Sequence, residues 1–184
     1  HEENVEVYSN CEQVELFLNG KSLGAQPRPS DDAPRNWKVP FAPGTIKAVG
    51  MNGGQVVATY ELRTAGPPAK IMLTTERNTL APVWDDVATV SATVVDANGV
   101  LVPTANDLIS FTISAPGRIA VVDSADNASH ESFQATERRA YQGRCFALLK
   151  TDAPRGRITL VASAPGLSSG SITINAIAPN GAQR

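Results

Sequence analysis

The fold class of this chain is decided by one stretch of its sequence, Val14-Glu15-Leu16-Phe17-Leu18-Asn19-Gly20. Val14, Leu16 and Leu18 are apolar at alternate positions, which is the pattern of a half-buried β-strand. Asn19-Gly20 follows at once and is a strong hairpin signal, because a type I′ turn needs positive φ at both central positions. The stretch therefore predicts a strand that enters a tight antiparallel hairpin.

Similar short alternations extend to both sides of this stretch. Asn52-Gly53-Gly54 predicts a second hairpin. Trp37 alternates in phase with Val39 and Phe41, so we expect its side chain to lie in the core. In this half of the chain, strands are predicted at residues 5–8, 14–18, 37–41, 45–49 and 55–62.

The second half of the chain repeats the pattern. Its clearest strand covers residues 87–95, where Ala88, Val90, Ala92 and Val94 share one face. No segment has a long 3.6-residue periodicity, so no helix is predicted. About seven strands are expected in this half, a number that suits an immunoglobulin-like sandwich. They lie at residues 71–73, 87–95, 108–113, 119–122, 144–149, 157–162 and 171–177.

A stiff connector, Ala65-Gly66-Pro67-Pro68, separates the two halves. The sequence thus predicts an all-β chain of two tandem immunoglobulin-like β-sandwich domains, residues 1–66 and 67–178, followed by a frayed polar tail at 179–184. The first domain is short, and we expect that it lacks a strand at its N-terminal side.

Composition excludes several classes of partner. The 184 residues carry a formal net charge of −2, and Lys and Arg are scattered, so we expect no nucleic-acid partner. No apolar run approaches the roughly 20 residues that span a bilayer, so no membrane partner is expected. Residues 1–4, His-Glu-Glu-Asn, lack the basic and apolar regions of a signal peptide.

Residues suited to catalysis are scarce. The chain has two histidines, and His130 lies in a polar segment typical of a solvated loop. The adjacent pairs Asp31-Asp32 and Asp85-Asp86 do not suit glycoside cleavage, because neighbouring side chains on an extended chain point to opposite sides. We therefore predict turn roles for these carboxylates and assign no catalytic residue.

Metal and cofactor sites are equally weak. Cys11 and Cys145 have no His or Cys at ligand spacing, which argues against zinc and favours two buried thiols over an interdomain disulfide. Asp123, Asp126 and Asn127 offer oxygens to calcium, but hydrogen bonding within an Asx turn is the stronger interpretation. No cofactor is predicted.

Carbohydrate binding on a β-sandwich needs exposed aromatic side chains. Trp84 lies in the polar-flanked segment Ala81-Pro82-Val83-Trp84-Asp85-Asp86, so it is the tryptophan expected at the surface and the single candidate for binding sugar. Aromatic residues make up only 5% of the chain, which argues against a sugar-stacking surface.

Two sets of motifs carry a family resemblance. Residues 5–24 read Val-Glu-Val-Tyr-Ser-Asn-Cys-Glu-Gln-Val-Glu-Leu-Phe-Leu-Asn-Gly-Lys-Ser-Leu-Gly, and this segment closely resembles the β-sandwich module that follows the catalytic barrel in bacterial family 2 glycoside hydrolases, the β-galactosidase-like enzymes. The second half, with Tyr141-Gln142-Gly143-Arg144 and Ala164-Pro165-Gly166-Leu167, resembles their C-terminal immunoglobulin-like domain and also modules of invasin-type adhesins.

The resemblance implies a non-catalytic accessory region whose partner is an upstream catalytic barrel of the same polypeptide. Its expected roles are packing on the barrel, shaping the cleft or aiding formation of a homo-oligomer. The barrel's two glutamates are absent here, so no catalytic residue is carried over. The resemblance also implies a periplasmic or secreted bacterial enzyme. Two alternatives stay open, a carbohydrate-binding module and an adhesin-like structural spacer.

Overall fold

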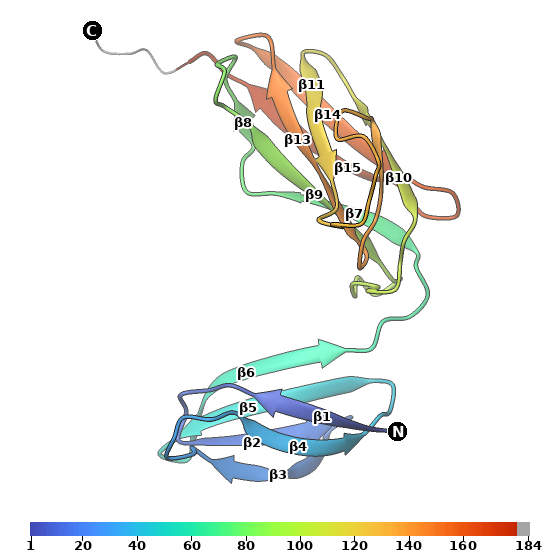
Figure 1. Cartoon of the computed structure of the whole chain (residues 1–184). Coiled ribbons are helices and arrows are strands. Elements are labelled where there is room, and N and C mark those ends of the chain that lie inside the picture. Colours follow the sequence, from blue (N-terminus) through green and yellow to red (C-terminus); the bar gives the residue numbers. More distant parts are fainter. Residues whose placement is uncertain (180–184) are drawn as a thin grey trace, which may run out of the picture. The chain divides into compact units, whose positions relative to one another are not determined.

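The computed structural model describes residues 1–179, which form fifteen β-strands and no helix, so the predicted all-β class is confirmed (Figure 1). The chain divides into two compact units, His1–Thr64 and Ala65–Arg184. The predicted connector begins at this division. The predicted frayed tail lies, apart from Pro179, outside the described residues.

The first unit contains two antiparallel sheets. A four-stranded sheet has the order β3-β2-β5-β6, and a two-stranded sheet pairs β1 with β4. The predicted hairpin is confirmed, because Asn19 and Gly20 both adopt positive φ (50° and 80°). The strands are β1 (Glu2–Val7), β2 (Gln13–Leu18), β3 (Lys21–Pro27), β4 (Arg35–Pro40), β5 (Thr45–Asn52) and β6 (Gln55–Arg63).

Apolar side chains between these two sheets form the core of the first unit. Val14 and Leu16 of β2 meet Trp37 and Val39 of β4, which confirms the core position predicted for Trp37. Phe41, which is in phase with Trp37 and Val39 in the sequence, is exposed. Strand β4 ends at Pro40, so the alternation stops there, and the ring of Phe41 stacks on His1 at 5.5 Å.

A buried arginine holds one side of this sandwich closed. The guanidinium of Arg35 donates to the carbonyl oxygens of Pro27 at 3.0 Å, Ser9 at 3.0 Å and Cys11 at 2.6 Å. It also donates to Gln26, at 3.2 Å. The side chain therefore ties β4 to the end of β3 and to the β1–β2 connection.

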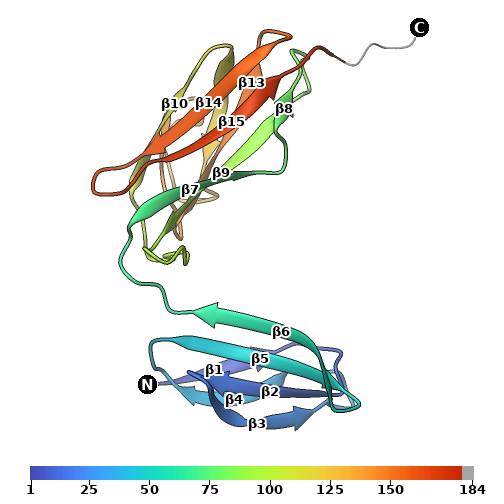
Figure 2. The same cartoon turned by 180° about the vertical axis from the view of Figure 1, so that it is seen from behind.

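The second unit is a sandwich of two larger sheets, with orders β12-β10-β14-β15-β8 and β11-β13-β9-β7 (Figure 2). The seven predicted strands are all present, and β8 and β12 are added to them. These two have two and three residues, too few to show a periodicity. The strands are β7 (Lys70–Thr75), β8 (Thr79–Leu80), β9 (Ala88–Val95), β10 (Leu108–Ile113), β11 (Gly117–Asp123), β12 (Glu137–Arg139), β13 (Arg144–Thr151), β14 (Gly156–Ser163) and β15 (Gly170–Ala176).

The core of the second unit follows the predicted alternation. One face of β9, made of Ala88, Val90, Ala92 and Val94, is fully buried. It packs with apolar residues of β10, β13, β14 and β15 in one continuous cluster. The alternation of small and branched side chains therefore specified this face correctly.

The start of the second unit is fixed by Asp96, a buried residue at the turn after β9. Its carboxylate accepts hydrogen bonds from the backbone N–H groups of Gly66 (2.8 Å), Val100 (2.8 Å) and Asn98 (2.9 Å). These donors, that of Gly66 first, hold the pKa of the Asp96 carboxyl below its usual range. The connector is thereby anchored to the second unit at Gly66.

Candidate interaction surface

The carboxylates considered for catalysis serve local structure. Asp31 accepts a hydrogen bond from the backbone N–H of Ala33, and Asp32 pairs with Arg28 at 2.7 Å. Asp86 pairs with Arg77 at 2.6 Å. Asp31 thus makes a turn contact of the predicted kind, whereas Asp32 and Asp86 form ion pairs. His130 is exposed on a loop, as its polar neighbours indicate.

The residues considered for calcium also have protein partners. Asp126 accepts a hydrogen bond from the backbone N–H of Ala128 at 3.0 Å, which is an Asx turn. Asp123 pairs with Arg138 at 2.9 Å, and Asn127 is exposed. Within residues 1–179, no group of three or more His, Cys, Asp or Glu gathers in an arrangement that could hold a metal ion.

Sequence reasoning missed the charged cluster around Arg138. Its side chain is only 1% exposed, and it pairs with Asp123 at 2.9 Å and with Glu131 at 3.7 Å. It also donates to the hydroxyl of Ser124 at 3.2 Å and lies over the ring of Phe133 at 5.4 Å. The cluster fastens β12 and the long loop before it to the end of β11, which is a structural role.

The two cysteines are free and buried in different units, which confirms the interpretation as buried thiols. Burial raises the pKa of the Cys145 thiol to about 12, with a smaller opposing effect of the positive charge of Arg138. Because the thiolate is the reactive form, Cys145 is unreactive while the second unit is folded.

The raised pKa of Cys145 predicts a pH dependence of stability. In the unfolded chain the thiol ionises near pH 8.5–9, so the stabilisation is complete below that pH and is lost as pH rises toward about 12. Over this interval the free energy of unfolding of the second unit should fall by about 1.4 kcal/mol per pH unit more than in a Cys145→Ala variant. Urea unfolding of both proteins at pH 8, 9.5 and 11 measures the difference. Parallel pH profiles would contradict it.

Trp84 lies at the surface, as predicted, with 86% of the residue exposed. Its backbone carbonyl accepts a hydrogen bond from Lys150. A shallow groove on β7 and β9 lies in the same unit, but Trp84 does not line it. The groove is lined by Thr74, Thr75, Glu76, Arg77, Val87, Thr89 and Ser91. Sugar binding by Trp84 stays a prediction.

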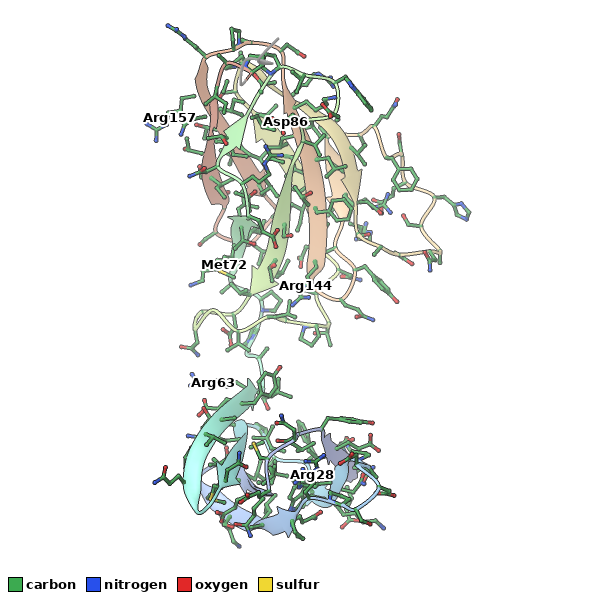
Figure 3. All side chains as sticks on the ribbon, turned by 90° about the vertical axis from the view of Figure 1, so that its left-hand side faces the viewer. Arg28, Arg63, Met72, Asp86, Arg144 and Arg157 are labelled. Atoms are coloured by element: carbon green, nitrogen blue, oxygen red, sulfur yellow. The ribbon has the colours of Figure 1, made fainter. Side chains whose placement is uncertain are left out.

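The most unusual surface in the described part of the chain is strand β6, in which every residue is exposed. Figure 3 shows this strand along one side of the first unit, with Arg63 at its end. Tyr60 is 67% exposed and Leu62 is 57% exposed. Exposed apolar side chains gathered on one strand are typical of an interaction surface.

Strand register places these side chains on the core face of the sheet. In adjacent strands, Leu16 of β2 pairs with Ala48 of β5, which pairs with Tyr60 of β6. Leu62 is two residues further along β6, so it lies on the same face as Tyr60. Burial falls across this face, because Leu16 is buried, Ala48 is half-buried and Tyr60 is exposed.

The opposite face of β6 is charged over the same stretch. Glu61 pairs with Lys47 at 3.6 Å and with Arg63 at 3.2 Å. The apolar side chains of β6 thus lie on the core face of the sheet, and the charged ones lie on the opposite face. The two-stranded sheet does not extend over β6, so the apolar side chains are uncovered. We call the uncovered part of the core face the open flank. It consists of Ile46, Ala48, Ala58, Tyr60 and Leu62.

Comparison with known families explains both units. Residues 71–173 match the model of the glycoside hydrolase family 2 C-terminal domain 5, and residues 2–58 match a domain of unknown function (DUF4982). The chain belongs to the family 2 C-terminal domains. The resemblance predicted from residues 5–24 and from the second half is therefore confirmed.

Relatives of this family 2 chain are glycosidases. It is 38% identical over 169 residues to the β-galactosidase BoGH2A of Bacteroides ovatus, covering 92% of the chain and 20% of that protein. It is 29% identical over 176 residues to a β-glucuronidase of Formosa agariphila, covering 93% of the chain and 18% of that protein. A β-glycosidase structure from Bacteroides vulgatus matches with a TM-score of 0.90 and 31% identity, covering 95% of the chain and 22% of that structure.

The family 2 chain thus spans about one fifth of the length of the relatives it matches. It is a non-catalytic domain of the hydrolase family, and the site to be explained is a surface rather than a catalytic centre. Among residues 1–179 there is no helix long and apolar enough to cross a membrane.

Proposed function

We propose that this chain is the accessory region of a larger family 2 glycoside hydrolase, here called the parent enzyme, and that it packs against the rest of that enzyme. The open flank carries this proposal. Tyr60 and Leu62 lie on the core face of their sheet, where apolar side chains gain stability only if another element covers them. A covering element from beyond the first unit supplies what the two-stranded sheet lacks.

The activity proposed for the parent enzyme is hydrolysis of a β-linked sugar. Matches to a β-galactosidase and a β-glucuronidase support this class and leave the sugar itself open. Contact with the barrel, shaping of its cleft and support of an oligomer are all compatible with the open flank. A periplasmic or secreted location stays a prediction from the resemblance.

Substituting Leu62 with asparagine tests the packing. If Leu62 is covered in the parent enzyme, this change should lower the free energy of unfolding of the first unit there by about 2–3 kcal/mol. Cys11 is buried in the same unit, so its alkylation rate reports opening of that unit. We expect Leu62→Asn to raise the alkylation rate of Cys11 in the parent enzyme by roughly 30- to 150-fold.

The matched control is Thr59→Asn, on the opposite face of β6 and exposed. It should change the alkylation rate of Cys11 by no more than about twofold, as expected for a surface substitution. Equal rates for Leu62→Asn and Thr59→Asn in the parent enzyme would show that the open flank stays uncovered there. That result would contradict the proposed packing.

A further inference from the structure

The backbone of β1 has one unused edge. Phe41 donates its N–H to the carbonyl of His1, and the register pairs Glu2 with Pro40. Hydrogen-bonded pairs alternate in an antiparallel ladder, so the N–H groups of Val5 and Val7 point to β4. The N–H groups of Glu2, Asn4 and Glu6 therefore point away from β4. Pro40 lies opposite Glu2, at a position that donates no hydrogen bond to β1, so its lack of an N–H costs nothing there. Among the described strands, β1 pairs with β4 alone.

This unused edge faces the open flank. Strand β4 is fastened to the β3 side of the unit, because Gln26 of β3 donates to the carbonyl of Asn36 and Arg35 donates to that of Pro27. Strand β1 pairs with the other edge of β4 and therefore lies on the side of β5 and β6. Burial agrees with this placement, because the inward residues of β4 are buried whereas Val5 and Val7 of β1 are only half-buried.

The gap is wide enough for at least one added strand. Neighbouring strands lie about 4.8 Å apart, so a sheet of four strands is about 10 Å wider than a sheet of two. Arg35 and the β3–β4 connection close the β3 side, which leaves the difference over β6. One strand added to β1 would lie over β5 and β6 and would cover Tyr60 and Leu62.

We propose that the first unit is completed by a β-strand of the parent enzyme that pairs with the free edge of β1 and covers the open flank. The inference rests on the proposed function. Its source is the polypeptide that precedes β1, because the matched family is a C-terminal domain and this chain accounts for about one fifth of its relatives. A preceding strand reaches the edge of β1 through a short hairpin turn.

The surroundings define the chemistry of this strand. Its inward residues meet Tyr60 and Leu62, so alternate positions should be apolar. On its outward face it meets the exposed carboxylates of Glu2 and Glu6 on β1. Cross-strand pairs of opposite charge are favourable, so we expect Lys or Arg at an outward position.

Amide-resolved hydrogen exchange of the parent enzyme tests the pairing. Strand addition predicts that the amides of Asn4 and Glu6 exchange about 100-fold more slowly in the parent enzyme than in the chain of residues 1–184. In the parent enzyme they should then match Val5 and Val7, which bond to β4 in either case. Replacing Asn4 with proline should abolish the slow exchange at Glu6, because proline cannot donate to an added strand.

The outcomes separate this inference from the proposed function. Fast exchange at Asn4 and Glu6 in the parent enzyme overturns strand addition. If Leu62→Asn still accelerates alkylation of Cys11 there, another surface of the enzyme covers the open flank and the proposed function stands. If neither effect is seen, both proposals fail. If the amides of Asn4 and Glu6 exchange slowly in residues 1–184, but only at high protein concentration, the strand that pairs with β1 comes from a second copy of the chain. That result would also overturn the proposed source of the strand.

Discussion

Replacing Arg138 with alanine is expected to destabilise the second unit by about 3–5 kcal/mol, the usual result of breaking a buried ion pair from one side. The guanidinium is 1% exposed and is bound by Asp123, Glu131 and Ser124. Its removal leaves the hydroxyl of the buried Ser124 without its donor and takes the positive charge away from the carboxylates of Asp123 and Glu131. It also removes the cation that lies over the ring of Phe133.

The rate of alkylation of Cys145 measures this effect, because Cys145 is buried in the same unit. Under conditions in which the unit recloses faster than it reacts, a loss of 3–5 kcal/mol raises the rate by roughly 10²- to 10³-fold or more. Cys11, in the other unit, is the internal reference and should keep its rate. The matched variant is Arg139→Ala, because Arg139 is exposed. Similar rates for Arg138→Ala and Arg139→Ala would contradict the structural role.

Much of the fold follows from local rules that act within a few residues. Asn19-Gly20 set the first hairpin, and the alternation of Ala88, Val90, Ala92 and Val94 set the buried face of β9. In each case the information lies in residues that are neighbours along the chain. The limits of this reasoning are visible at Phe41, where the alternation continues in the sequence but the strand has ended.

The buried arginines could not be predicted in this way. Arg35 and Arg138 occupy inward positions of their strands, where alternation alone predicts an apolar side chain. Their partners are far away in the sequence, since Arg35 binds the carbonyls of Ser9 and Cys11. Only the assembled fold brings these groups together.

The candidate interaction surface was equally hidden from the sequence. Tyr60 and Leu62 have the alternation of a buried face, and the pattern alone predicts that they are covered. Their exposure follows from the number of strands in the opposite sheet, which is a property of the tertiary structure. The sequence did predict that the first unit lacks a strand, and the open flank indicates where such a strand would lie.

The most direct test of the central claim is a hydrolysis assay of residues 1–184 beside the parent enzyme, with an aryl β-galactoside and an aryl β-glucuronide as substrates. We expect turnover by the parent enzyme and none by residues 1–184 above the rate in buffer alone. The expected difference in hydrolysis rate is large, because glycoside hydrolases accelerate this reaction by many orders of magnitude. The acceleration requires two suitably spaced carboxyl groups. Saturable hydrolysis of either substrate by residues 1–184 would contradict the account.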